Sequence, residues 1–280
     1  MSSVRAVAPP ASSGVRQAVA DGLVVAARNL MRVPRIPELA IFAVLQSIMF
    51  VLLFAFVFGG AIPLGPAYPG ANAYREYLMP GIFVQTIVFA AATTAIGMCE
   101  DVNKGIIDRF RSLPMARSAV LTGRTSSDVV YNGGILIVLM LAGLAVGWSV
   151  HTDIVRFLAG VGLLLLFAFS MAWLGVWLGL SVPAVEVAQQ VSFTVLFPIT
   201  FISAVFVPIR TMPDWLQPIA EWNPVTTLAS SLRGLWGNPN PPPGTGFPSE
   251  NPILVTLVWI VVIVAIFAPL GVRRYRNMSR

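Results

Sequence analysis

Six long apolar stretches limit what this chain can fold into. They cover residues 39–58, 78–99, 129–147, 157–180, 187–207 and 253–272. Each is close to the ~20 residues that an α-helix needs to cross the hydrocarbon core of a membrane, where backbone groups must find their hydrogen bonds within the helix. Charged residues make up only 11% of the chain, against about 25% in soluble proteins, which argues against a large soluble core. The sequence therefore predicts an all-α integral membrane protein, with six transmembrane helices in a domain at residues 36–275.

Basic residues predict the orientation of these spans. Most of the 18 lysines and arginines lie before the first span, between the second and third, and after the last. Because cytoplasmic loops carry the excess of Lys and Arg, we expect both termini in the cytoplasm, as an even number of spans requires. The net charge of +6 then follows from topology, and the sequence predicts no nucleic-acid partner.

The segments outside the spans also have distinct patterns. Residues 1–14 are rich in Ala, Ser and Pro, which predicts a disordered tail. Residues 15–35 repeat apolar side chains at spacings of three or four, which predicts an amphipathic helix on the cytoplasmic face of the membrane. A solvated helix without a membrane role is the alternative. Residues 276–280 are expected to form a short cytoplasmic tail.

The rare residue types exclude several kinds of chemistry. His151 and Cys99 are the only histidine and cysteine, too few for a Cys/His metal centre within one chain. The only lysine, Lys104, lies in an Asn-Lys-Gly sequence, whereas the phosphate-binding loop of ATPases needs Gly-Lys-Ser/Thr. We therefore expect no cofactor or metal on this chain, no enzymatic activity of its own, and any ATP hydrolysis on another polypeptide.

The loop between the second and third spans has the pattern of a short amphipathic helix. Ile106, Phe110 and Leu113 lie on one face of a helix, and Pro114 ends it because proline cannot continue the hydrogen-bond ladder. An apolar ridge that projects into the cytoplasm is suited to a partner's groove. Alternatively, the apolar face rests on lipid and the charges of the loop reflect topology alone.

The segment before the last span, residues 208–252, is too long for an idle connector. We expect two short helices, at about 213–221 and 224–236, inserted part-way from the outer side. Asn223 before Pro224 is a favourable N-cap for the second helix. Tryptophans favour the membrane–water boundary, and this segment holds Trp215, Trp222 and Trp236. The Pro-rich insert at 238–252 has no assigned role.

The sequence resembles the type-2 ABC export permeases over residues 15–275, and most of all their daunorubicin-resistance branch. The residues that carry the resemblance are Tyr77-Leu78-Met79-Pro80-Gly81-Ile82, Glu100, Gly105, Arg111-Ser112-Leu113-Pro114, Phe197-Pro198, Phe201-Ile202-Ser203, Val207-Pro208, Met212-Pro213-Asp214-Trp215-Leu216 and Asn223-Pro224.

The resemblance implies a membrane subunit of an exporter in the inner membrane of a bacterium. In such exporters two permeases, identical or sister chains, pair with two ATPase subunits that bind ATP and Mg. An N-terminal connecting helix lies on the cytoplasmic face, and a coupling helix between spans two and three docks on the ATPase. The residues that this places in or beside the coupling helix are Glu100, Asp101, Lys104, Gly105, Asp108, Arg109, Ser112, Leu113 and Pro114. The outer helices roof the translocation path in this family, and the residues assigned to them are Trp215, Trp222, Asn223 and Pro224.

The interior of the predicted spans favours an external source of energy. No Asp, Glu, Lys, Arg or His lies within the six segments, whereas ion-driven transporters usually need such groups as relays. The path is therefore expected to suit a hydrophobic or amphipathic molecule, such as a drug or a lipid. The candidates to line it are Gln46, Gln85, Phe193, Phe197 and Pro198. An ATPase-independent membrane scaffold or flippase is the alternative function.

Overall fold

The computed structural model describes residues 37–57, 62, 64–107, 117–241, 244 and 246–277. Several predictions fall outside these residues: the tail at 1–14, the interfacial helix at 15–35, residues 108–114 of the expected coupling helix, and residues 278–280 of the C-terminal tail. They stay predictions.

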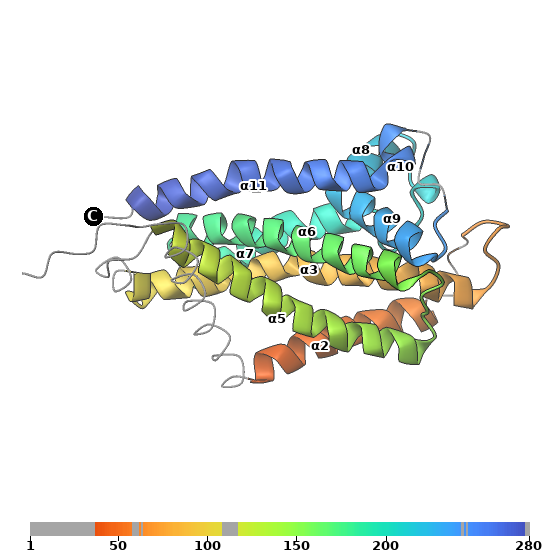
Figure 1. Cartoon of the computed structure of the whole chain (residues 1–280), viewed down its shortest axis with the longest axis horizontal. Coiled ribbons are helices and arrows are strands. Elements are labelled where there is room, and N and C mark those ends of the chain that lie inside the picture. The colour runs from red at the N-terminus through yellow and green to blue at the C-terminus, as the bar shows by residue number, and fades with distance from the viewer. Residues whose placement is uncertain are drawn as a thin grey trace, which may run out of the picture.

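The described residues form a bundle of long helices with short helices at one end, and they contain no strand (Figure 1). The long elements are α2 (Pro37–Leu52), which continues into the π-helical η2 (Leu53–Val57), α3 (Ala71–Asn103), α5 (Arg117–Val146), α6 (Ile154–Ser181), α7 (Val185–Phe201) and α11 (Pro252–Asn277). The short elements are η3 (Ile209–Thr211), α8 (Gln217–Trp222), α9 (Pro224–Trp236) and α10 (Phe247–Glu250). We call the end that holds α8, α9 and α10 the α9 end, and the opposite end, where α11 finishes, the C-terminal end.

Four described helices are long and apolar enough to cross a membrane. They are Asn72–Asn103, Leu121–Val146, Ile154–Ser181 and Pro252–Asn277, and they match the predicted second, third, fourth and sixth spans. The helices of the second and third spans extend beyond the predicted bounds, so α3 includes Glu76 and Asp101 and α5 includes Arg124 and Asp128. The chain is thus a multi-pass membrane protein; the count of six spans stays a prediction.

The predicted fifth span differs from the helix that forms. A continuous helix is expected over 187–207, but α7 has 17 residues and ends at Phe201. Residues 202–207 are non-helical, and most of their side chains are buried. Hydropathy cannot separate these two cases, because a turn buried inside the protein is as apolar as a helix that faces lipid.

α3 lies against α6 along much of its length, and two glycines permit the close approach. A β-carbon at Gly175 would collide with the carbonyl oxygen of Ala91, and one at Gly179 with that of Ala95. The α6 backbone therefore packs directly on the α3 backbone, as glycine pairs in membrane helices allow.

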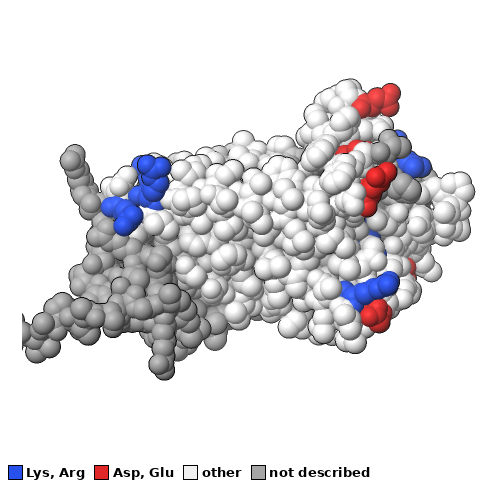
Figure 2. Space-filling model, turned by 45° about the horizontal axis from the view of Figure 1, so that its top comes forward, with Lys and Arg blue, Asp and Glu red and all other residues white. Residues whose placement is uncertain are grey.

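Charged side chains gather at the two ends of the bundle. On the face shown in Figure 2 the middle of the molecule carries none. The last turn of α11 holds Arg274 and Arg276, whereas Asp214, Glu221 and Glu250 belong to the α9 end. On this face an uncharged stretch thus separates the two ends, as expected where a protein faces lipid.

We expect Gly179→Ala to destabilise the protein, because the added methyl group must push α6 away from α3. Overpacking of this kind typically costs about 1–3 kcal/mol, and thermal unfolding of the purified protein in detergent measures it. Gly162→Ala on the same helix is the control, since its β-carbon meets nothing within 4 Å. Equal stability of the two variants would contradict direct backbone packing.

Candidate functional site

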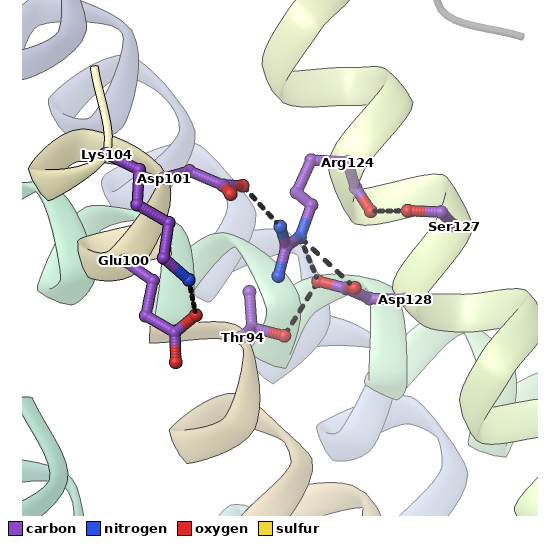
Figure 3. A network of polar contacts seen from close by, with 7 residues as sticks. All are labelled: Thr94, Glu100, Asp101, Lys104, Arg124, Ser127 and Asp128. Atoms are coloured by element: carbon purple, nitrogen blue, oxygen red, sulfur yellow. Dashed lines mark hydrogen bonds and ion pairs between the residues drawn. The ribbon is translucent and has the colours of Figure 1, made fainter. Parts of the chain in front are cut away.

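Four polar side chains link α3 to α5 at the C-terminal end of the bundle (Figure 3). Arg124 Nη1 donates to Asp101 Oδ2 at 2.8 Å, and Arg124 Nε lies 3.4 Å from the carboxylate of Asp128. Thr94 Oγ1 donates to Asp128 Oδ2 at 2.8 Å. We call these four residues the Arg124 network. Two of its contacts, Arg124–Asp101 and Thr94–Asp128, cross from one helix to the other.

Helical spacing explains how the Arg124 network assembles. Thr94, Gly97 and Asp101 are three and four residues apart and therefore share one face of α3. The guanidinium of Arg124 occupies the space where a β-carbon of Gly97 would lie. The side chains of Arg124 and Asp101 are only 13% and 7% exposed. Buried charges need complete pairing, so this constellation favours one register between α3 and α5.

Sequence reasoning does not single out Arg124 or Asp128 as site residues. It assigns Arg124 to the basic cytoplasmic loop, and it places Asp128 at the end of a span. The available signal is their four-residue spacing at the start of a predicted span, which puts opposite charges on one helical face.

The residues at the end of α3 include the described part of the expected coupling segment. Glu100 and Lys104 form an ion pair at 2.8 Å, and the Lys104 side chain is 54% exposed. Asp101 instead points toward α5 and is buried. Gly105 ends the helix with a φ of +66°, and its N–H donates to the carbonyl of Val102. Asp108, Arg109, Ser112, Leu113 and Pro114 lie outside the described residues.

The residues expected to line the path lie on three helices. Gln85 of α3 is buried, whereas Gln46 of α2 is exposed. Phe193, Phe197 and Pro198 are exposed on α7. Only a narrow stripe of α7 is buried, formed by Ala188, Ser192, Leu196 and Thr200. The Phe193 ring also contacts Phe89 of α3, one turn from Gln85.

The non-helical residues 202–207 are held by two tyrosines of α3 at the α9 end. The hydroxyl of Tyr77 donates to the carbonyl of Ala204 at 2.7 Å, and that of Tyr74 to the carbonyl of Phe206 at 3.0 Å. Buried carbonyls that lack a helical partner need such donors. We call residues 202–207 the buried turn.

Arg233 of α9 also donates to carbonyls of the buried turn. Its Nη2 donates to the carbonyls of Ala204 and Val205, at 2.8 and 3.2 Å, and its Nε to the carbonyl of Tyr77 at 2.9 Å. The guanidinium also lies 3.6 Å from the centroid of the Tyr77 ring. Burial lowers the pKa of Arg233, but arginine keeps its charge at neutral pH.

Arg233 is buried although it carries a charge: only 1% of the residue is exposed. Among the residues that the structure describes, no carboxylate forms an ion pair with it. Carbonyl dipoles and the Tyr77 ring replace the counter-ion, which a sequence pattern does not reveal.

Asn223 joins the end of α7 to the start of α9. It is the predicted N-cap of α9, since its side-chain oxygen accepts from the N–H of Val225. Its amide nitrogen also donates to the carbonyls of Ile199 and Ile202, both at 2.7 Å. One side chain therefore satisfies backbone groups of two helix ends, next to Pro224 at the first helical position.

The tryptophans at this end do not share one environment. Trp215 and Trp222 are 72% and 54% exposed, in keeping with a place at the membrane boundary. The expectation for Trp236 is wrong, because its side chain is fully buried and its indole N–H donates to the carbonyl of Phe157. The Trp236 ring packs edge-on against Trp148. It belongs to the core because α9 itself lies inside the bundle and not on its surface.

The only histidine lies at the α9 end, in a small polar group. His151 Nε2 is 3.1 Å from both carboxylate oxygens of Glu76 and 3.2 Å from the hydroxyl of Ser149. Within the described ranges, no three His, Cys, Asp or Glu residues are grouped so as to hold a metal ion.

We expect Arg233→Lys to destabilise the protein, because an ammonium group cannot reach the same three carbonyls while it stacks on Tyr77. A buried acceptor that loses its donor costs about 1–3 kcal/mol, which thermal unfolding in detergent measures. The exposed Arg210, also at the α9 end, supplies the control Arg210→Lys, which should leave stability unchanged. If both variants unfold at the same temperature, Arg233 does not hold the buried turn.

Comparison with known proteins identifies the family. Residues 22–236 match the family model of the ABC-2 type transporter. The chain is 32% identical over 253 residues to the daunorubicin resistance ABC transporter permease protein of Streptomyces coeruleorubidus, which covers 90% of this chain and 84% of that protein. It is 23% identical over 270 residues to the probable doxorubicin resistance ABC transporter permease protein of Mycobacterium tuberculosis, which covers 95% and 93% of the two chains. The chain therefore belongs to the ABC-2 type transporter family and is the membrane permease subunit of an ABC exporter.

Proposed function

We propose that this permease moves a hydrophobic or amphipathic molecule, such as a drug or a lipid, out across the inner membrane of a bacterium. Two bacterial relatives carry names that refer to daunorubicin resistance and to probable doxorubicin resistance. The uncharged middle of the face shown in Figure 2 supports an apolar cargo, because charges inside a membrane are costly. A separate ATPase subunit that binds ATP and Mg supplies the energy.

The contact with the ATPase is proposed at the segment that joins α3 to α5. The observation that carries this assignment is that α3 ends and α5 begins at the C-terminal end of the bundle (Figure 1). Lys104 is exposed there, and Gly105 turns the chain out of α3. The proposed interface comprises Glu100, Asp101, Lys104, Gly105, Asp108, Arg109, Ser112, Leu113 and Pro114. This places the C-terminal end, with both termini, in the cytoplasm.

The translocation path is proposed beside α7, between this permease and a second copy or a sister chain. Phe193, Phe197 and Pro198 lie on the side of α7 that the bundle leaves uncovered. A helix that packs by one narrow stripe has room for a partner or a cargo on its other faces. Gln85 and Gln46 would supply polar contacts from the neighbouring helices.

The outer gate is proposed at α8 and α9. Their assigned residues are Trp215, Trp222, Asn223 and Pro224, of which Asn223 holds the end of α7. Movement of α7 would therefore pull directly on α9. With α2 and α7 counted as spans, the chain crosses the membrane six times.

The first test is purification of the permease from its native membrane. We expect an ATPase subunit with a Gly-Lys-Ser/Thr loop to copurify, and the complex to export daunorubicin or a fluorescent phospholipid from proteoliposomes only when ATP is present. Export by the permease without an ATPase would instead support the self-sufficient flippase, and no export of either probe would support a scaffold.

The coupling assignment is tested by Gly105→Pro. Proline fixes φ near −65° and lacks an N–H, so it cannot reproduce the positive φ of Gly105 or its bond to Val102. We expect ATP-driven export to fall about tenfold or more, within the usual range of coupling energies. The control is Gly147→Pro, at the other end of α5, where φ is +99° and the N–H also donates to a carbonyl. Equal losses in both variants would indicate a general folding defect.

A further inference from the structure

The Arg124 network is more elaborate than the packing of two apolar helices requires. It buries Asp101 and partly buries Arg124 and Asp128, at the end of two candidate spans. A buried ion pair adds little net stability compared with well-packed apolar side chains. It does depend on geometry: the two hydrogen bonds that cross between the helices, Arg124–Asp101 and Thr94–Asp128, form only at one relative height and rotation of α3 and α5. Arg124 therefore acts on the relative position of the two helices.

The same helix that carries Thr94 and Asp101 reaches the buried turn at its other end. Tyr74 and Tyr77 of α3 donate to carbonyls of that turn. Between the two polar ends, α3 packs backbone to backbone on α6. Close packing of this kind resists bending and compression. A displacement of α3 at the C-terminal end must therefore reach the turn, and through Arg233 it reaches α9.

From this arrangement we propose that Arg124 is a positioning residue for energy coupling. It holds α3 and α5 in one register, so that a movement of the segment between them displaces both helices as a unit. α3 then transmits the displacement to the buried turn and α9. This inference rests on the proposed ATPase-driven function and concerns only how the movement crosses the membrane.

A purely structural role for the Arg124 network makes a different prediction. If it only stabilises the fold, a variant that restores stability without the charges will also restore export. If it sets the register, such a variant will be stable and yet poorly coupled, because apolar contacts allow the helices to slide and rotate. The experiment must therefore separate stability from coupling.

The single variant Arg124→Met leaves Asp101 and Asp128 buried without their cation, and we expect it to be unstable. The informative variant combines Asp101→Leu, Arg124→Met and Asp128→Asn. It removes every charge of the network and keeps an acceptor for the Thr94 hydroxyl. Replacement of a buried ion pair by apolar side chains is often neutral for stability, so we expect a wild-type unfolding temperature.

The measurement is the number of probe molecules exported per ATP hydrolysed, with the full complex in proteoliposomes and daunorubicin and a fluorescent phospholipid as probes. We expect the triple variant to export about tenfold fewer molecules per ATP than the wild type, within the usual range of coupling energies. The control is Arg156→Gln, which breaks an exposed ion pair with Asp153 at the α9 end and should leave the ratio unchanged.

Each outcome is decisive for one of the two proposals. A stable triple variant with a wild-type export ratio overturns the positioning role of Arg124. A ratio that falls in proportion to lost stability, with the same slope in Gly179→Ala, also overturns it. Failure of the wild-type complex to hydrolyse ATP would instead overturn the proposed function.

Discussion

Backbone groups that lie away from water must find hydrogen-bond partners within the protein, and the α9 end depends on this constraint. The buried turn after α7 cannot use helical bonds, so its carbonyls accept from Tyr74, Tyr77 and Arg233. Each of these donors belongs to another helix. The hydrogen bonds that satisfy the carbonyls of the turn therefore also attach the turn to α3 and α9.

The polar contacts of the Arg124 network, at the C-terminal end, differ because they join side chains to side chains. Here Arg124 donates to side-chain carboxylates and not to backbone carbonyls. Arg124 bonds to Asp101 across the helix pair and to Asp128 on its own helix. α3 thus has a polar attachment at each end and close apolar packing between them, which is the arrangement expected of a helix that transmits movement.

Much of the fold could be predicted from the sequence, because a helix that crosses lipid needs a run of about 20 apolar residues. Long apolar runs correctly indicated α3, α5, α6 and α11, and Asn223-Pro224 correctly marked the start of α9. The prediction was wrong where an apolar run is buried by protein and not by lipid, as at 202–207. Trp236 was misplaced for the same reason: a sequence pattern does not show whether an amphipathic helix lies on the surface of the bundle or inside it.

The sequence by itself determined that this protein lies in a membrane, where most of its spans are, and to which family it belongs. These properties follow from residue type and local order. Only the tertiary structure decided which polar groups meet. Thr94 and Asp128 are 34 residues apart, and Tyr77 and Arg233 are 156 apart. Their contacts depend on how whole helices pack, to which glycines such as Gly97 and Gly179 contribute by leaving space. A local sequence pattern does not reveal that space, because residues from several helices shape the space together.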